Sequence, residues 1–114
     1  MGDFVEREIQ QIVHFVTAAF LYSGNDEIEG VVMDILGYLP ARSANEILFV
    51  LQLAEDATDE RVQRACARSL AIATPLGDDA WRALEVGKTS KVKVVREAIE
   101  ERLGRRKAEI SAYQ

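Results

Sequence analysis

Two side chains of this sequence are of the types that most often act as nucleophiles, proton-transfer groups or zinc ligands. They are His14 and Cys66, the single histidine and the single cysteine of the chain. Together they are too few for the usual zinc sites built from histidine and cysteine. No acidic residue is placed in the sequence to orient His14, so we expect a surface histidine rather than a proton-transfer group. Cys66 is expected in the core, because unpaired cysteine is among the most buried residue types. These residues predict no catalytic site, no metal and no cofactor.

Two further patterns could carry chemistry but fit structural roles better. The tripeptide Gly87-Lys88-Thr89 matches the end of a phosphate-binding loop, yet Arg82 stands where that motif needs its first glycine, and a helix rather than a strand is expected before it. Acidic side chains gather at 26–29 and at 55–60 without the spacing of a calcium loop. They lie in turns and at expected helix starts, where negative charge is favoured by the helix dipole. Both patterns therefore predict helix ends rather than ligand sites.

The elements that would position any site are expected to be helices. Apolar residues recur at helical spacing along nearly the whole chain, and only 2 prolines and 7 glycines interrupt it, too few for many short strands. We expect a single domain over 1–114. The predicted elements are a helix over 3–22, a first helical pair over 26–54, a second pair over 58–87 and a last helix over 90–104 with a basic C-terminal end.

A repeat organises these helices. The stretch VREAIEERL, 95–103, has the apolar pattern of VQRACARSL, 62–70, at a distance of 33 residues, and a weaker third copy covers 28–36. A repeat of this length that holds two helices is typical of an α-solenoid. It predicts a shared core composed of Val62, Ala65, Cys66, Leu70, Val95, Ile99 and Leu103 packed against Ile47, Leu51 and Leu84.

A family resemblance supports the same architecture. The stretch EDATDERVQRACARSLAIA, 55–73, resembles the first helix of a HEAT-like repeat, as does Val95-Arg96 with Ala98 and Leu103. Gln63 stands where Arg96 keeps the family's usual arginine, so armadillo-like and other helical-pair repeats remain open. The resemblance implies an all-α, short right-handed solenoid of about six helices. It also implies that the second helix of each pair lines a concave ridge that binds partner proteins.

The third predicted helix contains a candidate surface for such binding. A helical wheel places Phe49 and Leu53 opposite the expected core stripe of this helix, which consists of Ala44, Ile47, Leu48 and Leu51. The repeat spacing makes Arg82 and Val86 their equivalents, and a looser alignment adds His14. The predicted partner-binding residues are therefore Phe49, Leu53, Arg82, Val86 and His14. The alternative is that a neighbouring helix covers Phe49 and Leu53.

Charge is distributed unevenly along the chain, and this distribution limits the kinds of molecule that we expect the protein to bind. The net charge is −5, but 1–80 carries 5 basic and 14 acidic side chains, whereas 81–114 carries 9 basic and 5 acidic ones. An acidic body repels phosphate backbones, so we expect no nucleic-acid partner. The basic end is either a solvated helix terminus or a contact for an acidic partner. The longest apolar run, 12–22, is too short to span a bilayer, and no leader segment is evident, so a cytoplasmic protein without membrane contact is expected.

Three functions are compatible with these observations. The favoured one is a non-catalytic adaptor that binds another protein on the ridge of its second helices. The alternative is a small acidic inhibitor such as an immunity protein or antitoxin, and a more distant alternative is a tetrapyrrole-binding relative of the HEAT-like bilin lyases. A second copy of the chain is left open as a further partner.

Overall fold

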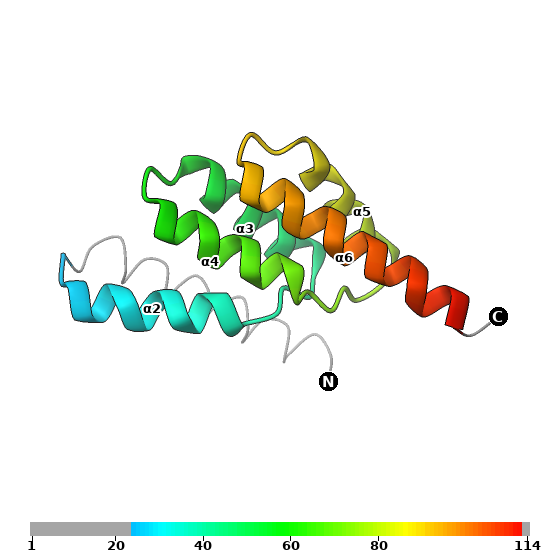
Figure 1. Ribbon diagram of the computed structural model, residues 1–114, viewed down its shortest axis with the longest axis horizontal. Coiled ribbons are helices and arrows are strands. Elements are labelled where there is room, and N and C mark those ends of the chain that lie inside the picture. The colour runs from blue at the N-terminus through cyan, green and yellow to red at the C-terminus, as the bar shows by residue number, and fades with distance from the viewer. Residues whose placement is uncertain (1–23, 113–114) are drawn as a thin grey trace.

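The computed structural model describes residues 24–112, which contain α-helices and no strand (Figure 1). The helices are α2 (Asp26–Tyr38), α3 (Ala44–Asp56), α4 (Glu60–Ala71), α5 (Asp78–Val86), the 3-10 helix η1 (Gly87–Thr89) and α6 (Lys93–Ala112). The prediction of an all-α protein is confirmed for this part of the chain. The number of α-helices in it is five rather than about six, because the helix predicted over 3–22 lies outside the described residues.

The helices pack in two layers. In one layer α4 lies between α2 and α6 and contacts both, and in the other α3 contacts α5 (Figure 1). The layers are joined by contacts of α3 with α4 and of η1 with α6. Helices that alternate along the chain therefore lie next to one another in space, and the 33-residue echo corresponds to the neighbours α4 and α6.

Side-chain caps explain where α3 and α4 begin. The Ser43 hydroxyl accepts a hydrogen bond from the Glu46 N–H at 3.1 Å, and the Glu46 carboxylate accepts one from the Arg42 N–H at 3.3 Å. Asp59 caps α4 by accepting from the Arg61 N–H at 2.8 Å. These bonds satisfy N–H groups that have no partner inside the first helical turn. Ser43 and Glu46 thus form the capping box that their spacing predicts, and of Thr58 and Asp59, either of which could open α4, Asp59 is the residue that caps it.

The last helix differs from its predicted bounds of 90–104. It begins at Lys93, because the Ser90 hydroxyl instead accepts from the Val92 N–H at 3.2 Å in a turn. It also continues through Gly104 to Ala112. Glycine is a weak helix former, and its position near the predicted end made it an expected stop signal.

Contacts made by arginines of α6 account for the longer helix. Arg102 Nε donates to the Ala73 carbonyl at 2.7 Å, and Arg105 donates to the Ala71 carbonyl. Arg106 lies over the Trp81 ring, with its guanidinium carbon 4.1 Å from the ring centroid. The Ala71 carbonyl belongs to the last residue of α4, and the Ala73 carbonyl follows two residues later, so both arginines approach the C-terminal end of that helix, where cations are favoured by the helix dipole. These tertiary contacts hold the last turns of α6 in place and offset the cost of Gly104.

The core is the one predicted from the repeat. All ten residues expected there are buried and belong to one hydrophobic cluster. The two strong copies of the repeat, on α4 and α6, place their matching apolar residues inside this cluster. The weak copy on α2 does so only in part: Leu36 is buried, but Val31, which the repeat aligns with the buried Ala65, is exposed, and so is Ile35.

The loops that follow α2 and α4 run side by side. The Thr74 N–H donates to the Ala41 carbonyl and the Leu76 N–H donates to the Arg42 carbonyl, both at 3.0 Å. The Ser69 hydroxyl donates to the Leu39 carbonyl at 2.6 Å. Because these bonds tie the turn within one helical pair to the turn within the next, they help to set how α3 and α5, which follow the two turns, lie relative to each other.

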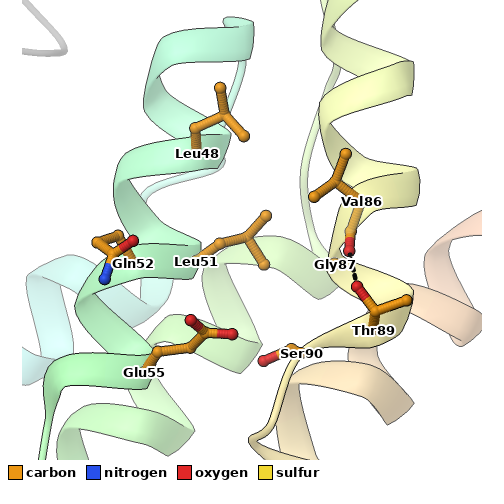
Figure 2. A pocket seen from close by; sticks show the side chains of 8 residues that line it. All are labelled: Leu48, Leu51, Gln52, Glu55, Val86, Gly87, Thr89 and Ser90. Carbon is orange, nitrogen blue, oxygen red and sulfur yellow. Dashed lines mark hydrogen bonds between the residues drawn. The ribbon is translucent and has the colours of Figure 1, made fainter.

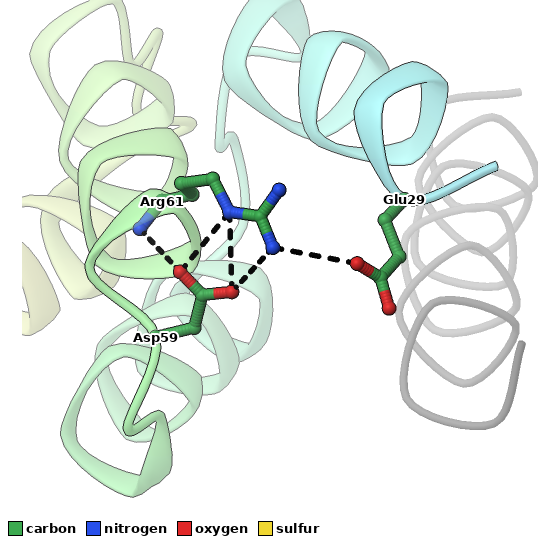
Figure 3. A network of polar contacts seen from close by, with 3 residues as sticks. All are labelled: Glu29, Asp59 and Arg61. Atoms are coloured by element: carbon green, nitrogen blue, oxygen red, sulfur yellow. Dashed lines mark hydrogen bonds and ion pairs between the residues drawn. The ribbon is translucent and has the colours of Figure 1, made fainter. Parts of the chain in front are cut away.

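A polar network joins α2 to the start of α4 at the surface (Figure 3). Arg61 Nη2 lies 2.9 Å from Asp59 Oδ2 and 3.3 Å from Glu29 Oε2. Hydrogen bonds from Arg61 lower the pKa of the Asp59 carboxyl. Since such exposed ion pairs contribute little to stability, we regard this network as a solvated helix cap rather than a site.

Candidate functional site

The outward faces of α3 and α5 form the candidate binding surface, which we call the α3–α5 ridge. Its residues are Asn45, Leu48, Gln52 and Glu55 on α3 with Asp79, Arg82 and Val86 on α5; all seven are exposed. They recur at intervals of three and four along each helix, which places them on one side of it. Direct packing of α3 on α5 brings the two exposed faces next to each other.

A cleft of about 200 Å³ lies between α3 and the end of α5 (Figure 2). Leu48 and Val86 occupy its two sides, and 45% and 59% of their respective surfaces are exposed. Leu51 and Gly87, which also line it, are buried. The cleft therefore combines exposed apolar side chains with a floor that belongs to the packed core.

Polar groups surround this apolar centre. Glu55 lines the cleft, and Gln52 donates to Asp56 at 3.0 Å. Thr89 Oγ1 donates to the Val86 carbonyl at 2.9 Å, so its hydroxyl hydrogen is already used. The cleft thus offers a carboxylate beside apolar surface. Its lining residues include no cysteine or histidine, and the hydroxyls of Thr89 and Ser90 already serve in turns.

The predicted partner-binding residues fall into three groups. Arg82 and Val86 are exposed, as expected for a surface site. Arg82 Nη1 lies 3.7 Å from Asp79 Oδ1. Phe49 and Leu53 are half-buried and pack against the core cluster, so the prediction that they face away from the core is wrong. His14 lies outside the described residues.

Leu48 is the apolar residue of the ridge that sequence reasoning missed. It was assigned to the core stripe of its helix, but it is the side chain that α3 leaves exposed at the cleft. Residues 47–51 are apolar without interruption, so several different stripes fit the helical wheel equally well. One available signal was the repeat, which aligns Leu48 with Trp81, a residue that is also only half-buried.

Cys66 occupies the core, as predicted. Its side chain is fully buried in α4, and burial raises the pKa of its thiol to about 12. The thiolate is the reactive form, so a nucleophilic role for Cys66 is not supported. Gly87-Lys88-Thr89 forms η1 directly after α5, so a helix precedes this tripeptide where a phosphate-binding loop requires a strand.

The burial of Cys66 leads to a direct test. A thiol reagent at near-neutral pH should modify the native protein far more slowly than the same protein in denaturant, because reaction requires both exposure and thiolate formation. Ellman's reagent, followed by absorbance with and without guanidinium chloride, measures the two rates. Equal rates would contradict the assignment of Cys66 to the core.

Other kinds of site are not indicated in the described part of the chain. Residues 24–112 bring together no group of three or more histidine, cysteine or acidic side chains that could hold a metal ion. Among these residues no helix combines the length and apolarity needed to cross a bilayer. Comparison of the chain with protein-family models, curated proteins and solved structures finds no match.

Proposed function

We propose that this protein is a non-catalytic interaction module that binds a partner protein on the α3–α5 ridge. The observation that carries the proposal is the pair Leu48 and Val86, two exposed apolar side chains on facing sides of one cleft. Fully burying such a side chain contributes about 1.5–3 kcal/mol. Because about half of each surface is already covered, a partner that inserts an apolar side chain between them recovers part of this energy, whereas an isolated exposed leucine needs no explanation.

The charge around the cleft indicates the chemistry of the partner. Residues 24–59, which include α2 and α3, contain eight acidic side chains and a single basic one, Arg42. Glu55 brings one of these carboxylates to the cleft itself. The best complement is therefore a protein segment with an apolar anchor flanked by lysine or arginine, since complementary charge raises association rates and disfavours other partners.

The packing of the helices supports a repeat architecture for this module. Each strong sequence copy is a helix of one layer, and the second helices of the two pairs, α3 and α5, lie together in the other. This is the arrangement expected of a short HEAT-like solenoid, in which second helices form the partner-binding surface. The ridge at which Leu48 and Val86 are exposed is that surface.

A second candidate function is inhibition of a basic protein, as in immunity proteins and antitoxins. The excess of acidic side chains over 24–59 favours it, because a small acidic protein can cover a basic functional surface. Both functions use the same ridge. They differ in what binding does to the partner, and an activity assay on the recovered partner distinguishes them.

The proposal is tested by the variant Leu48→Asp. A carboxylate at the cleft removes apolar contact and must be desolvated on binding, so we expect partner capture to be lost while thermal stability stays close to that of the unmodified protein. Affinity capture from the native host with quantitative mass spectrometry measures the loss, and hydrogen exchange on the purified complex should protect α3 and α5.

The matched control is Leu76→Asp. Leu76 is similarly exposed but lies before the start of α5, at the opposite end of that helix from Val86. This control should capture the partner as the unmodified protein does. If Leu48→Asp retains the partner, or if both variants lose it equally, the ridge is not the binding surface. Phe49 is unsuitable for this test, because its packing against the core would mix binding with stability.

A further inference from the structure

We infer that copies of this chain associate end to end, with the outer face of α2 of one copy entering the cleft between α5 and α6 of the next. The two surfaces lie at opposite ends of the layer formed by α2, α4 and α6 (Figure 1). Neither belongs to the α3–α5 ridge, so this inference is independent of the proposed function.

One face of α2 is both apolar and exposed. Val31, Ile35 and Tyr38 follow one another at intervals of four and three residues, and 59%, 43% and 69% of their respective surfaces are exposed. Such spacing places them on one side of the helix. In stacked helical proteins an exposed apolar helix face promotes further stacking. The helix α2 therefore presents an apolar stripe suited to packing against another helix.

The other end of the layer has a cleft that side chains of a helix can enter. It has a volume of about 330 Å³ and lies between the last turn of α5 with η1 and the second half of α6. Leu103 and Ile110 supply apolar surface, and 49% of the Ile110 surface is exposed. Gly104 lies between them on α6 with nothing within 4 Å of the place a Cβ would occupy. This open position at Gly104 lets another backbone approach α6 closely.

Charge matches the two surfaces to each other. The helix α2 contains four acidic residues and no basic one, and Asp34 is exposed beside its apolar stripe. The cleft is lined by Lys88, Arg106 and Lys107 against two carboxylates, Glu85 and Glu100. Within the described residues neither Lys88 nor Lys107 takes part in an ion pair, so both are available to an acidic partner.

The geometry defines the type of assembly. Different surfaces meet in each contact, so the association is heterologous and extends to further copies unless the rotation closes a ring. A helix of 13 residues, about 20 Å long, laid in a groove buries an area at the low end for stable complexes. The assembly is therefore expected to depend on protein concentration and to weaken with added salt.

Two complementary variants test the inference by sedimentation velocity. Val31→Lys places a cation on the α2 stripe and leaves the cleft intact. The double variant Lys88→Glu with Lys107→Glu reverses the charge of two residues that line the cleft and leaves α2 intact. The unmodified protein should form dimers and larger species as its concentration rises. Each variant alone should associate with an affinity at least about tenfold lower. An equimolar mixture of the two should restore association at least to dimers, because the intact cleft of Val31→Lys meets the intact α2 stripe of the double variant.

Three outcomes would overturn the inference. The unmodified protein could stay monomeric at every accessible concentration, the mixture could fail to restore dimers, or Val31→Lys could lower the melting temperature sharply in a monomeric protein. The last result would mean that residues 1–23 of the same chain occupy the α2 stripe. Leu48→Asp should leave self-association unchanged. A result against self-association can therefore be distinguished from a result against partner binding on the α3–α5 ridge.

Discussion

Replacing Leu70 by alanine is expected to lower the free energy of unfolding by about 2–5 kcal/mol. Leu70 is fully buried near the C-terminal end of α4, the helix that contacts both α2 and α6 in its layer. Truncation removes apolar burial and leaves a cavity, and because α4 has neighbours on both sides, the surrounding helices cannot close on that cavity without losing other contacts. Urea unfolding followed by circular dichroism measures the change.

Leu76→Ala provides the matched control for that measurement. The same atoms are removed, but Leu76 is exposed, so we expect a change within about 0.5 kcal/mol. Equal effects of the two substitutions would show that Leu70 does not belong to the core. The comparison also cancels effects common to both variants, such as a change in the unfolded chain on replacing leucine by alanine.

Gly87→Ala is expected to destabilise the protein by about 1–3 kcal/mol through overpacking. An added Cβ would lie 1.9 Å from Ile99 Cδ1 and 2.8 Å from Leu51 Cδ2. Both neighbours are buried core side chains, so neither can move into solvent to make room. The φ angle of Gly87 is −66°, which alanine adopts readily, so the expected effect is steric and not conformational.

A second substitution isolates this steric cause. Ile99→Val removes the Cδ1 atom and alone should cost about 0.5–1.5 kcal/mol. If the clash with Cδ1 dominates, the double variant should be more stable than the sum of the single effects predicts, a coupling that thermal or urea unfolding can measure. Strict additivity would contradict the proposed contact. Gly87 also lines the cleft of the α3–α5 ridge, so Gly87→Ala should weaken partner capture even where the protein remains folded.

The α-helical class and most of the core could be predicted because both depend on local periodicity. The echo between 62–70 and 95–103 repeats the same apolar positions, and such positions on neighbouring helices converge on a common core. The caps at Ser43 and Asp59 were predictable for a similar reason, since a capping side chain acts within its own helical turn. For Cys66, residue type and repeat position together indicated burial.

The candidate site could be predicted only in outline. Sequence reasoning selected α3 and α5 and identified Val86 and Arg82 as surface residues, but it chose Phe49 and Leu53 in place of Leu48. In an uninterrupted apolar run a helical wheel shows which residues share a side of the helix, but it contains no information on how many neighbouring elements surround that helix. Which side chain remains exposed depends on the positions of those neighbours.

Composition, periodicity and capping by themselves determined that this chain forms helices, where most of them begin, and which apolar residues of α4 and α6 converge. Only the tertiary structure decided that α6 continues past Gly104, that Leu48 and Val86 face each other across a cleft, and that α2 exposes Val31, Ile35 and Tyr38. The physical reason is range. Helix propensity and caps act within a few residues, whereas the bonds of Arg102 to Ala73 and of Arg105 to Ala71 join residues 29 and 34 positions apart, and no local pattern encodes which carbonyls they meet.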